Sequence, residues 1–184
     1  MGNREDMGSS VSSKLRAVLF DRDGTLVVDV PYNGDPSLVT PMPGAKAVLD
    51  ALRADGIATG VISNQSGIAR GLITSANVAD VNARVEELLG PFDVWEVCPH
   101  SEQDGCDCRK PAPGMVQSAC RKLGIQESEA ALIGDIGADV LAAEAAGATG
   151  VLVPTPVTRA EEVAEAQLVA RNLAEAVSLL SERP

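Results

Sequence analysis

Short apolar runs alternate with amphipathic stretches along this chain, and this alternation constrains the fold more than any other feature. The runs are typical of buried strands, and the stretches between them have the periodicity of helices. The predicted strands are residues 17–20, 57–62, 92–97, 130–133 and 149–153. A β-α-β-α order predicts a three-layer α/β/α sandwich around a central parallel sheet.

The predicted helices lie between and after these strands. Ser75 is a good N-cap for the stretch at 75–89, whose valines and leucines recur at helical spacing. The other predicted helices are residues 44–54, 113–123, 138–146, 161–170 and 172–180. Helices in these positions would cover both faces of the sheet.

The segments outside the predicted strands and helices limit the number of domains that the chain can form. Residues 30–43 contain four prolines, and residues 99–112 have no regular period, so both are expected to be loops. Neither is long enough to be a large cap domain. A chain of 184 residues fits one domain, which we expect over residues 14–184 after a mobile tail at 1–13.

The charge and hydropathy of the chain exclude some classes of partner. A formal net charge of −11 argues against a nucleic-acid backbone. A small anionic substrate stays compatible, because a bound metal and a few cations can reverse the field in one cleft. No apolar run approaches the roughly 18 residues of a membrane span, and the first residues lack the apolar segment of a signal peptide. We expect a cytoplasmic monomer that binds neither nucleic acid nor membrane.

Two carboxylates follow the first predicted strand. Asp21 and Asp23 come directly after it, and Gly24 then turns the chain. In α/β proteins, ligands bind beyond the carboxyl ends of parallel strands. Carboxylates this close repel each other, and a divalent cation such as Mg²⁺ would relieve the repulsion. The alternative is a solvated turn, since Asp and Gly are ordinary turn residues.

Later strand ends deliver further polar groups to the same edge of the predicted sheet. Each of them alone could be an ordinary turn, helix cap or surface pair. Their arrival in order along the chain favours one shared site. These groups are Ser63, Asn64, Arg109, Lys110, Asp135 and Asp139.

The four cysteines are unevenly spread. Cys98, Cys106 and Cys108 lie within eleven residues, and His100, the only histidine, lies among them. In a cytosolic protein, clustered cysteines are more often metal ligands or redox groups than structural disulfides. Cys120 stands apart in a helical pattern, where it is expected to pack as a small apolar residue.

These residues together resemble the motifs of a known superfamily. From about residue 14 to 153, the chain is similar to the haloacid dehalogenase superfamily of phosphohydrolases. The cysteine and histidine pattern further resembles its zinc-bearing subgroup, which contains histidinol-phosphate and heptose-bisphosphate phosphatases. The matching segments are residues 21–25, Ser63, Cys98-Pro99-His100, residues 106–111, Gly134-Asp135 and Asp139.

The resemblance implies a role for each residue at the strand ends. Asp21 would be the nucleophile that forms an aspartyl-phosphate, and Asp23 would be the general acid and base. Ser63 and Lys110 would hold the oxygens of the transferred phosphoryl group. Catalytic Mg²⁺ would be held by the carboxylates of Asp21 and Asp135 and by the backbone carbonyl of Asp23.

The same resemblance implies a structural zinc ion. Cys98, His100, Cys106 and Cys108 would supply three thiolates and one imidazole, which form a closed tetrahedral set. Such a zinc would fix the loop that carries Arg109 without taking part in the chemistry. The alternative is a group of reduced thiols beside a surface histidine.

The substrate is less constrained than the reaction. Residues 63–71 are similar to the second motif of heptose-bisphosphate phosphatases, which implies that Asn64, Gln65, Arg70 and Arg109 bind the substrate. The five residues between His100 and Cys106 are typical of the histidinol-phosphate branch, and Ile136 stands where the heptose enzymes commonly have a cation.

Several functions therefore remain open. A heptose 1,7-bisphosphate 7-phosphatase is favoured. The alternatives are a phosphatase for histidinol phosphate or other small sugar phosphates, and a catalytically silent binding protein. The complete set of acidic and basic motif residues argues against the last of these.

Overall fold

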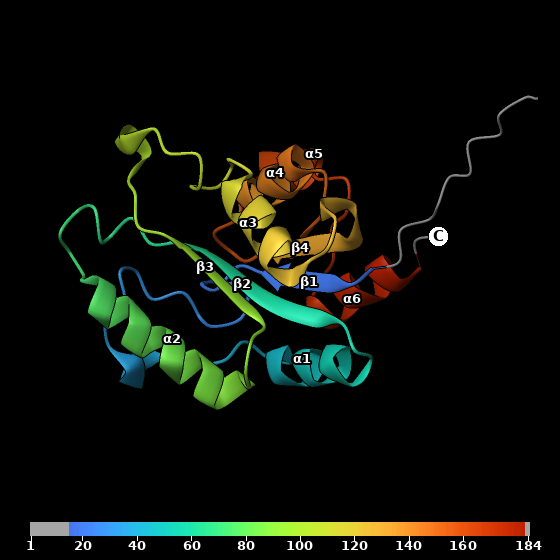
Figure 1. Cartoon of the computed structure of the whole chain (residues 1–184), viewed down its shortest axis with the longest axis horizontal. Helices are drawn as coiled ribbons and strands as arrows, with labels where there is room; N and C mark the ends of the chain where they lie inside the picture. Colours follow the sequence, from blue (N-terminus) through green and yellow to red (C-terminus); the bar gives the residue numbers. More distant parts are fainter. Residues whose placement is uncertain (1–14, 183–184) are drawn as a thin grey trace, which may run out of the picture.

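A five-stranded parallel sheet forms the centre of the molecule (Figure 1). The computed structural model describes residues 15–182, so the predicted tail at 1–13 lies outside the described residues. The strands are β1 (Ala17–Phe20), β2 (Ala58–Asn64), β3 (Val94–Cys98), β4 (Ala130–Gly134) and β5 (Thr149–Leu152). Their order across the sheet is β3-β2-β1-β4-β5, and every neighbouring pair is parallel.

Helices cover both faces of this sheet and complete three layers. In Figure 1, α1, α2 and α6 lie on one side, and α3, α4 and α5 lie on the other. The helices are α1 (Ala45–Ala54), α2 (Ser75–Leu89), α3 (Gly114–Leu123), α4 (Gly137–Ala146), α5 (Ala160–Glu165) and α6 (Leu173–Ser181). The prediction of a three-layer fold with a parallel sheet and no large cap is confirmed.

The central strand β1 is buried on both faces. Successive side chains of a strand point to opposite sides. Val18 and Phe20 accordingly pack into the core beneath α1, α2 and α6, whereas Ala17 and Leu19 pack into the core beneath α3 and α4. All four side chains are fully buried. This explains why the sequence shows a continuous apolar run here and no alternation.

Two helical predictions are wrong in detail. The N-cap of α2 is Thr74 and not Ser75, because the Thr74 hydroxyl accepts a hydrogen bond from the Asn77 N–H at 3.1 Å. The helix predicted at 161–170 ends at Glu165. After it the chain runs extended beside β5, where the N–H groups of Leu152 and Ala170 donate to the carbonyls of Leu168 and Leu152. Backbone pairing with β5 replaces the last helical turns.

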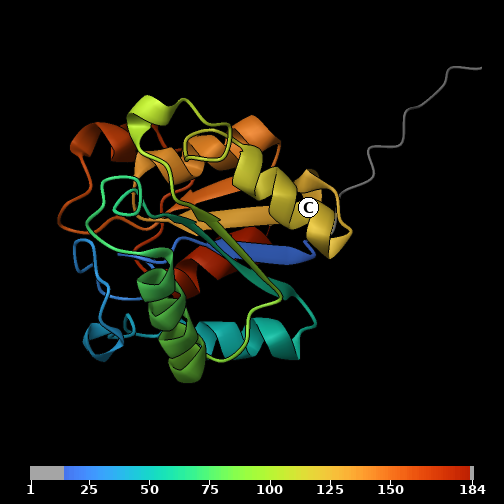
Figure 2. The same ribbon diagram turned by 60° about the vertical axis from the view of Figure 1, so that its left-hand side comes forward.

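The strand order creates one crevice beyond the carboxyl ends of β1 and β4. From β1 the chain moves outward through β2 to β3, then crosses to β4 on the other side of β1. Ligands of open α/β sheets bind at such a switch point. The segment predicted as a loop at 30–43 contains one short 3₁₀ helix, Pro36–Leu38. Figure 2 shows the loops that follow β1, β2 and β3 gathered at one end of the sheet.

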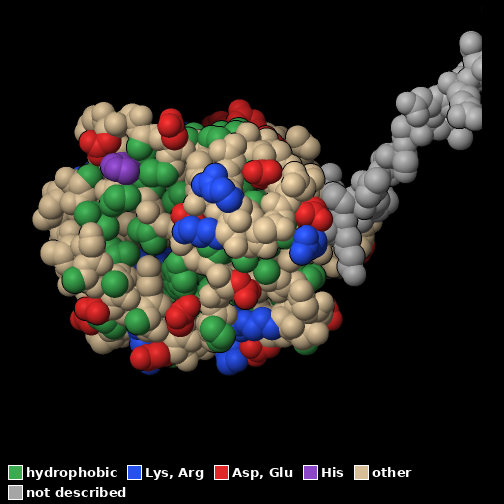
Figure 3. Space-filling view, viewed as in Figure 1, with side chains coloured by type: hydrophobic (Ala, Val, Ile, Leu, Met, Phe, Trp, Pro, Cys, Tyr) green, Lys and Arg blue, Asp and Glu red, His purple; other side chains and the backbone are tan. Residues whose placement is uncertain are grey.

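The distribution of charge on the surface and the apolar character of the helices are relevant to the partners that the protein can bind. On the face shown in Figure 3, acidic and basic side chains are interspersed among polar and apolar ones. Within residues 15–182, none of the helices combines the length and the apolar character that crossing a bilayer requires.

Candidate active site

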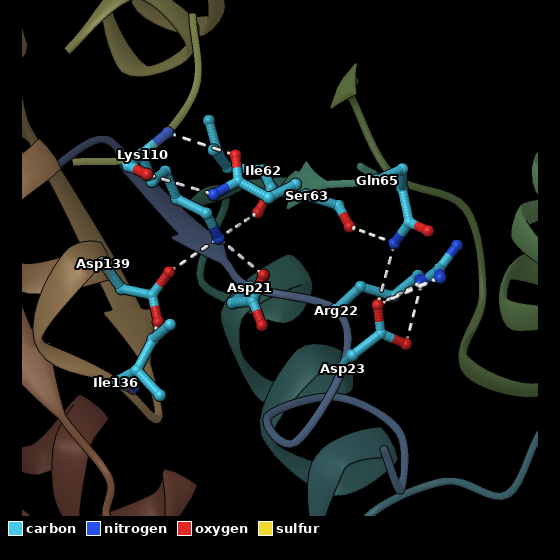
Figure 4. A network of polar contacts seen from close by, with 10 residues as sticks. Asp21, Arg22, Asp23, Ile62, Ser63, Gln65, Lys110, Ile136 and Asp139 are labelled. Carbon is cyan, nitrogen blue, oxygen red and sulfur yellow. Dashed lines mark hydrogen bonds and ion pairs between the residues drawn. The ribbon is translucent and has the colours of Figure 1, made fainter. Parts of the chain in front are cut away.

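A buried lysine lies at the centre of the crevice. The Lys110 ammonium donates to the Asp21 carboxylate at 2.6 Å and to the Ile62 carbonyl at 2.8 Å, and it forms an ion pair with Asp139 at 2.6 Å. Figure 4 shows this ammonium between the two carboxylates. Asp21 follows β1, Ile62 lies in β2 and Asp139 lies in the first turn of α4. The lysine thus connects three elements of the crevice.

Burial and crowding of carboxylates shift the pKa values of this group. Burial raises the pKa of Asp21 to about 8, and nearby Asp139 and Asp23 add to the shift, while Lys110 opposes it. Burial likewise raises the pKa of Asp135 to about 7, again with Asp139 contributing. Burial alone would lower the pKa of Lys110, but Asp139 and Asp21 outweigh it and raise the pKa above its ordinary value.

The same carboxylates form a candidate cation site. Ligand oxygens of Asp21, Asp135 and Asp139 all lie within 4.8 Å of one another, and all three residues are buried. One ammonium, that of Lys110, contacts these carboxylates. When all three carboxylates are ionised, the group therefore has an excess of negative charge. A divalent cation with oxygen ligands would balance that excess. Because Asp21 and Asp135 line the cleft, whereas Asp139 is fully buried and does not line it, Asp21 and Asp135 are the better placed ligands.

Gly24 explains how Asp135 can come so close to the loop after β1. Gly24 has a φ of +83°, which is strained for residues with side chains, and a Cβ at this position would overlap the Asp135 carboxylate. The backbone carbonyl of Asp135 is in turn fixed by the Thr158 hydroxyl, which donates to it at 2.6 Å.

Asp23 turns away from Asp21 toward a separate set of partners. The Arg22 guanidinium lies 3.0–3.1 Å from both Asp23 oxygens, and the Gln65 amide donates to one of them at 2.9 Å. Arg22 is only 1% exposed and also donates to Asn82 of α2 at 2.7 Å. Asp23 therefore has a fixed orientation, as Figure 4 shows.

The side chains at the carboxyl end of β2 and just after it have unequal access to the crevice. The Ser63 hydroxyl is buried and accepts a hydrogen bond from Gln65 at 2.8 Å. Asn64 makes two hydrogen bonds to the backbone of Lys110, one to its carbonyl at 3.2 Å and one from its N–H at 3.1 Å. Gln65 connects Ser63 with Asp23. The structure thus shows Asn64 and Gln65 holding two motif residues, in addition to lining the crevice.

The two predicted arginines do not line the cleft around Asp21. Arg70 is exposed and donates to the Tyr32 hydroxyl at 3.2 Å, and it does not line the cleft around Asp21. Arg109 is half-buried, pairs with Glu102 at 3.4 Å and lines a neighbouring hollow that also includes Lys110.

A second group of ligands lies in the loop after β3. The sulfurs of Cys98, Cys106 and Cys108 lie 3.1–3.7 Å apart, and His100 Nδ1 is 3.2 Å from Cys108 Sγ and 3.5 Å from Cys98 Sγ. Tetrahedral zinc with thiolate ligands spaces sulfurs by about 3.8 Å. All four cysteines are free thiols. The donor set therefore fits a closed zinc site.

Local hydrogen bonds favour ionisation of one thiol in this cluster, whereas burial raises the pKa values of the Cys98 and Cys108 thiols. Burial opposes ionisation of Cys106, yet the backbone N–H groups of Arg109 and Cys108 help to bring the pKa of its thiol down to about 7. A thiolate is the form that binds metals. The loop is also tied to β2, because the Gln65 N–H donates to the Cys98 carbonyl at 2.7 Å.

Some of the groups at the strand ends line a cleft with a volume of about 340 Å³. Asp21, Asp23, Lys110 and Asp135 line it, as the sequence predicts for groups at strand ends. Several further lining residues carried no recognised signal in the sequence. These are Arg22, Asp29, Val30, Pro31, Tyr32, Asn33 and Val157.

Comparisons with known proteins agree with this arrangement. Residues 107–176 match the family described as HAD-hydrolase-like. The D-glycero-beta-D-manno-heptose-1,7-bisphosphate 7-phosphatase of Pseudomonas putida is 35% identical over 77% of this chain and 83% of its own length. The enzyme of the same name from Salmonella typhi is 35% identical over 94% of this chain and 99% of its own length.

A solved structure extends the similarity to the fold. The D,D-heptose 1,7-bisphosphate phosphatase of B. bronchiseptica, complexed with magnesium and phosphate, aligns with a TM-score of 0.81 and 27% identity. The alignment covers 92% of this chain and 100% of that one. By sequence and fold, this chain belongs to the haloacid dehalogenase-like phosphatases, in the family that includes the heptose-bisphosphate phosphatases.

Proposed function

We propose that the protein is a Mg²⁺-dependent phosphomonoester hydrolase that works through an aspartyl-phosphate on Asp21. The observation that carries this proposal is the position of Asp21, which lies at a strand end 2.6 Å from a buried ammonium and close to the carboxylate of Asp135. A carboxylate alone is a poor nucleophile for a phosphate dianion, because both are negative. Positive charge at this place offsets that repulsion.

In the first step, an oxygen of Asp21 attacks phosphorus and the ester P–O bond breaks. The leaving alkoxide takes a proton from Asp23, which Arg22 and Gln65 hold in one orientation at the cleft. In the second step, water attacks phosphorus, Asp23 takes a proton from that water, and the bond between phosphorus and the Asp21 oxygen breaks. Inorganic phosphate and the free carboxylate result.

The remaining groups of the cleft would stabilise charge. Lys110, together with Ser63, would bind the oxygens of the transferred phosphoryl group. Mg²⁺ held by Asp21, Asp135 and the backbone carbonyl of Asp23 would supply further positive charge to the same oxygens. Because Asp139 and Asn64 fix Lys110 from two sides, the ammonium needs little reorganisation when substrate enters.

We propose D-glycero-D-manno-heptose 1,7-bisphosphate as the substrate, with the 7-phosphate removed. The names and the length coverage of the relatives support this choice. Arg109 supports it as well, because a guanidinium in the hollow next to Lys110 could bind a second phosphate. In this proposal zinc holds the loop of Arg109, and the protein is a monomer in the cytoplasm, a reducing compartment that suits its free cysteines.

The test is phosphate release with Mg²⁺ from heptose 1,7-bisphosphate, histidinol phosphate and several sugar monophosphates, with Asp21→Asn as the blank. A preference for the bisphosphate of at least 100-fold in kcat/KM, about 2.7 kcal/mol of transition-state binding, supports the heptose assignment. A preference for histidinol phosphate, or equal low rates throughout, rejects that assignment and keeps the phosphatase class.

The covalent step has a separate test. Rapid acid quenching during turnover should leave one phosphoryl group on the peptide that contains Asp21, detectable by mass spectrometry. Asp21→Asn should lower kcat by at least about 10³-fold while the fold is retained. Near-normal turnover in this variant would exclude the aspartyl-phosphate.

A further inference from the structure

One turn beside the cleft has a residue type that its backbone does not favour. The Asn33 N–H donates to the Val30 carbonyl at 3.1 Å, which closes a β-turn over residues 30–33. Pro31 is the second residue of the turn, and Tyr32, the third, has a φ of +52°. Proline followed by a positive φ is the pattern of a type II turn, in which the third residue is normally Gly or Asn. A tyrosine with this φ is strained.

Burial does not explain this tyrosine, since its side chain remains 45% exposed. One edge of its ring lies against Gly67, where an added Cβ would be 2.8 Å from a ring carbon. Its hydroxyl accepts a hydrogen bond from Arg70 at 3.2 Å. These contacts set the orientation of the ring at the cleft, which both Tyr32 and Gly67 line. Strained residues concentrate at functional sites.

The lining of the cleft combines polar and apolar surface. Asp21, Lys110 and Asp135 are buried polar groups. Among the lining residues that reach solvent, Tyr32, Ile136 and Val157 are apolar or aromatic, at 45%, 37% and 73% exposure, and the exposed Pro31 and half-buried Val30 add to this apolar surface. A substrate bound through its phosphate to the buried groups would extend its leaving group toward this exposed apolar surface.

We propose that Tyr32 is a specificity-determining residue that binds the apolar C–H face of a sugar ring in the leaving group. The inference rests on the proposed phosphatase function, which places the phosphate at Asp21. An aromatic ring offers a flat apolar surface with a polar end, and a pyranose ring has a face of C–H groups that matches it. An acyclic phosphate ester has no such face and gains less from the ring.

The test measures binding without turnover. Heptose 1,7-bisphosphate and glycerol 3-phosphate are titrated calorimetrically, with Mg²⁺, into Asp21→Asn protein that carries Tyr32 or one of two replacements. Tyr32→Asn accepts the positive φ and removes the ring, whereas Tyr32→Phe keeps the ring and removes only the hydroxyl. Leu38→Ala, which changes an exposed apolar side chain of the same loop outside the cleft, is the matched control.

We expect Tyr32→Asn to raise the Kd of the heptose ester by at least about tenfold relative to that of glycerol 3-phosphate. Tyr32→Phe and Leu38→Ala should leave this ratio within about twofold. The Tm of Tyr32→Asn should equal or exceed that of the parent, because strain is relieved. An unchanged ratio, a lowered Tm in Tyr32→Asn, or no binding of the heptose ester to the parent would overturn the proposal. Absence of phosphate release by the wild type would instead refute the hydrolase function alone.

Discussion

Lys110 and Asp139 form an ion pair of 2.6 Å in which the two side chains are 2% and 0% exposed. The same ammonium reaches Asp21 at 2.6 Å. A buried ammonium is costly unless carboxylates compensate it. Asp139 therefore keeps Lys110 charged and in place without itself reaching the exposed part of the cleft.

Asp139→Asn should weaken both folding and catalysis. The substitution keeps the shape of the side chain and removes its charge, so Lys110 keeps only one carboxylate partner. We expect the free energy of unfolding to fall by about 1–3 kcal/mol and kcat/KM to fall by about ten- to 100-fold. Urea unfolding and steady-state kinetics measure the two effects. Asp80→Asn, on an exposed position of α2, is the control, and equal losses in both variants would contradict this role.

Substitution of Asn64 should lower kcat more than it changes KM. Its amide makes two hydrogen bonds to the backbone of Lys110, so Asn64→Ala releases the segment that positions the ammonium. We expect kcat to fall about tenfold and the free energy of unfolding to fall by about 1–2 kcal/mol. The motif resemblance instead implies substrate binding by Asn64. A rise in KM at unchanged kcat would support that role and contradict the positioning role.

The parts of the fold that were predictable are those in which local pattern and tertiary burial agree. The run at 17–20 became β1 with the predicted ends, because both of its faces are buried. Residues 75–89 became α2 for a similar reason, since one apolar face packs on the sheet. The prediction failed at 166–170, where pairing with Leu152 of β5 overrides helical periodicity. Such pairing depends on a distant segment and leaves no local signal.

The candidate site likewise contains residues that local sequence predicts and residues that it does not predict. Asp21, Lys110 and Asp135 were predictable because each follows a strand, and parallel strands bring their carboxyl ends together. Arg22 between two aspartates suggests a solvated turn, yet it is 1% exposed because Asn82 of α2, sixty residues away, accepts its hydrogen bond. The position of Tyr32 depends on Gly67 in another loop. Both arrangements come from tertiary contacts that spacing along the chain does not encode.

Removal of the zinc ligands should loosen the loop that leads to Lys110. Cys106→Ser replaces one thiolate of the cluster, and we expect loss of stoichiometric zinc together with about 3 kcal/mol or more of stability. Cys120→Ser makes the same chemical change at a buried cysteine outside the cluster. It should keep its zinc. Metal analysis of protein purified without chelator measures this, and a Cys106→Ser protein with full zinc would refute the ligand assignment.

Stabilisation by Mg²⁺ should grow with pH. In the metal-free fold, the raised pKa values of Asp21, about 8, and Asp135, about 7, lie well above the ordinary 3.8. At pH values between 3.8 and these raised pKa values, the folded protein binds more protons at Asp21 and Asp135 than the unfolded chain does. The contribution of these two carboxyls to the free energy of unfolding therefore falls as pH rises. Mg²⁺ requires the ionised carboxylates and must displace these protons at low pH.

The measurement is the increase in Tm caused by a fixed concentration of Mg²⁺, followed from about pH 5.5 to about pH 8.5 with zinc retained. We expect a small increase at the acidic end and a progressively larger one through pH 7 to 8, because proton competition is lost as Asp135 and then Asp21 ionise. Asp135→Asn removes one of these groups and should flatten the profile as well as lower the plateau. If the Mg²⁺-dependent increase in Tm of the wild type is the same at every pH, these carboxylates are not the ligands that bind the ion.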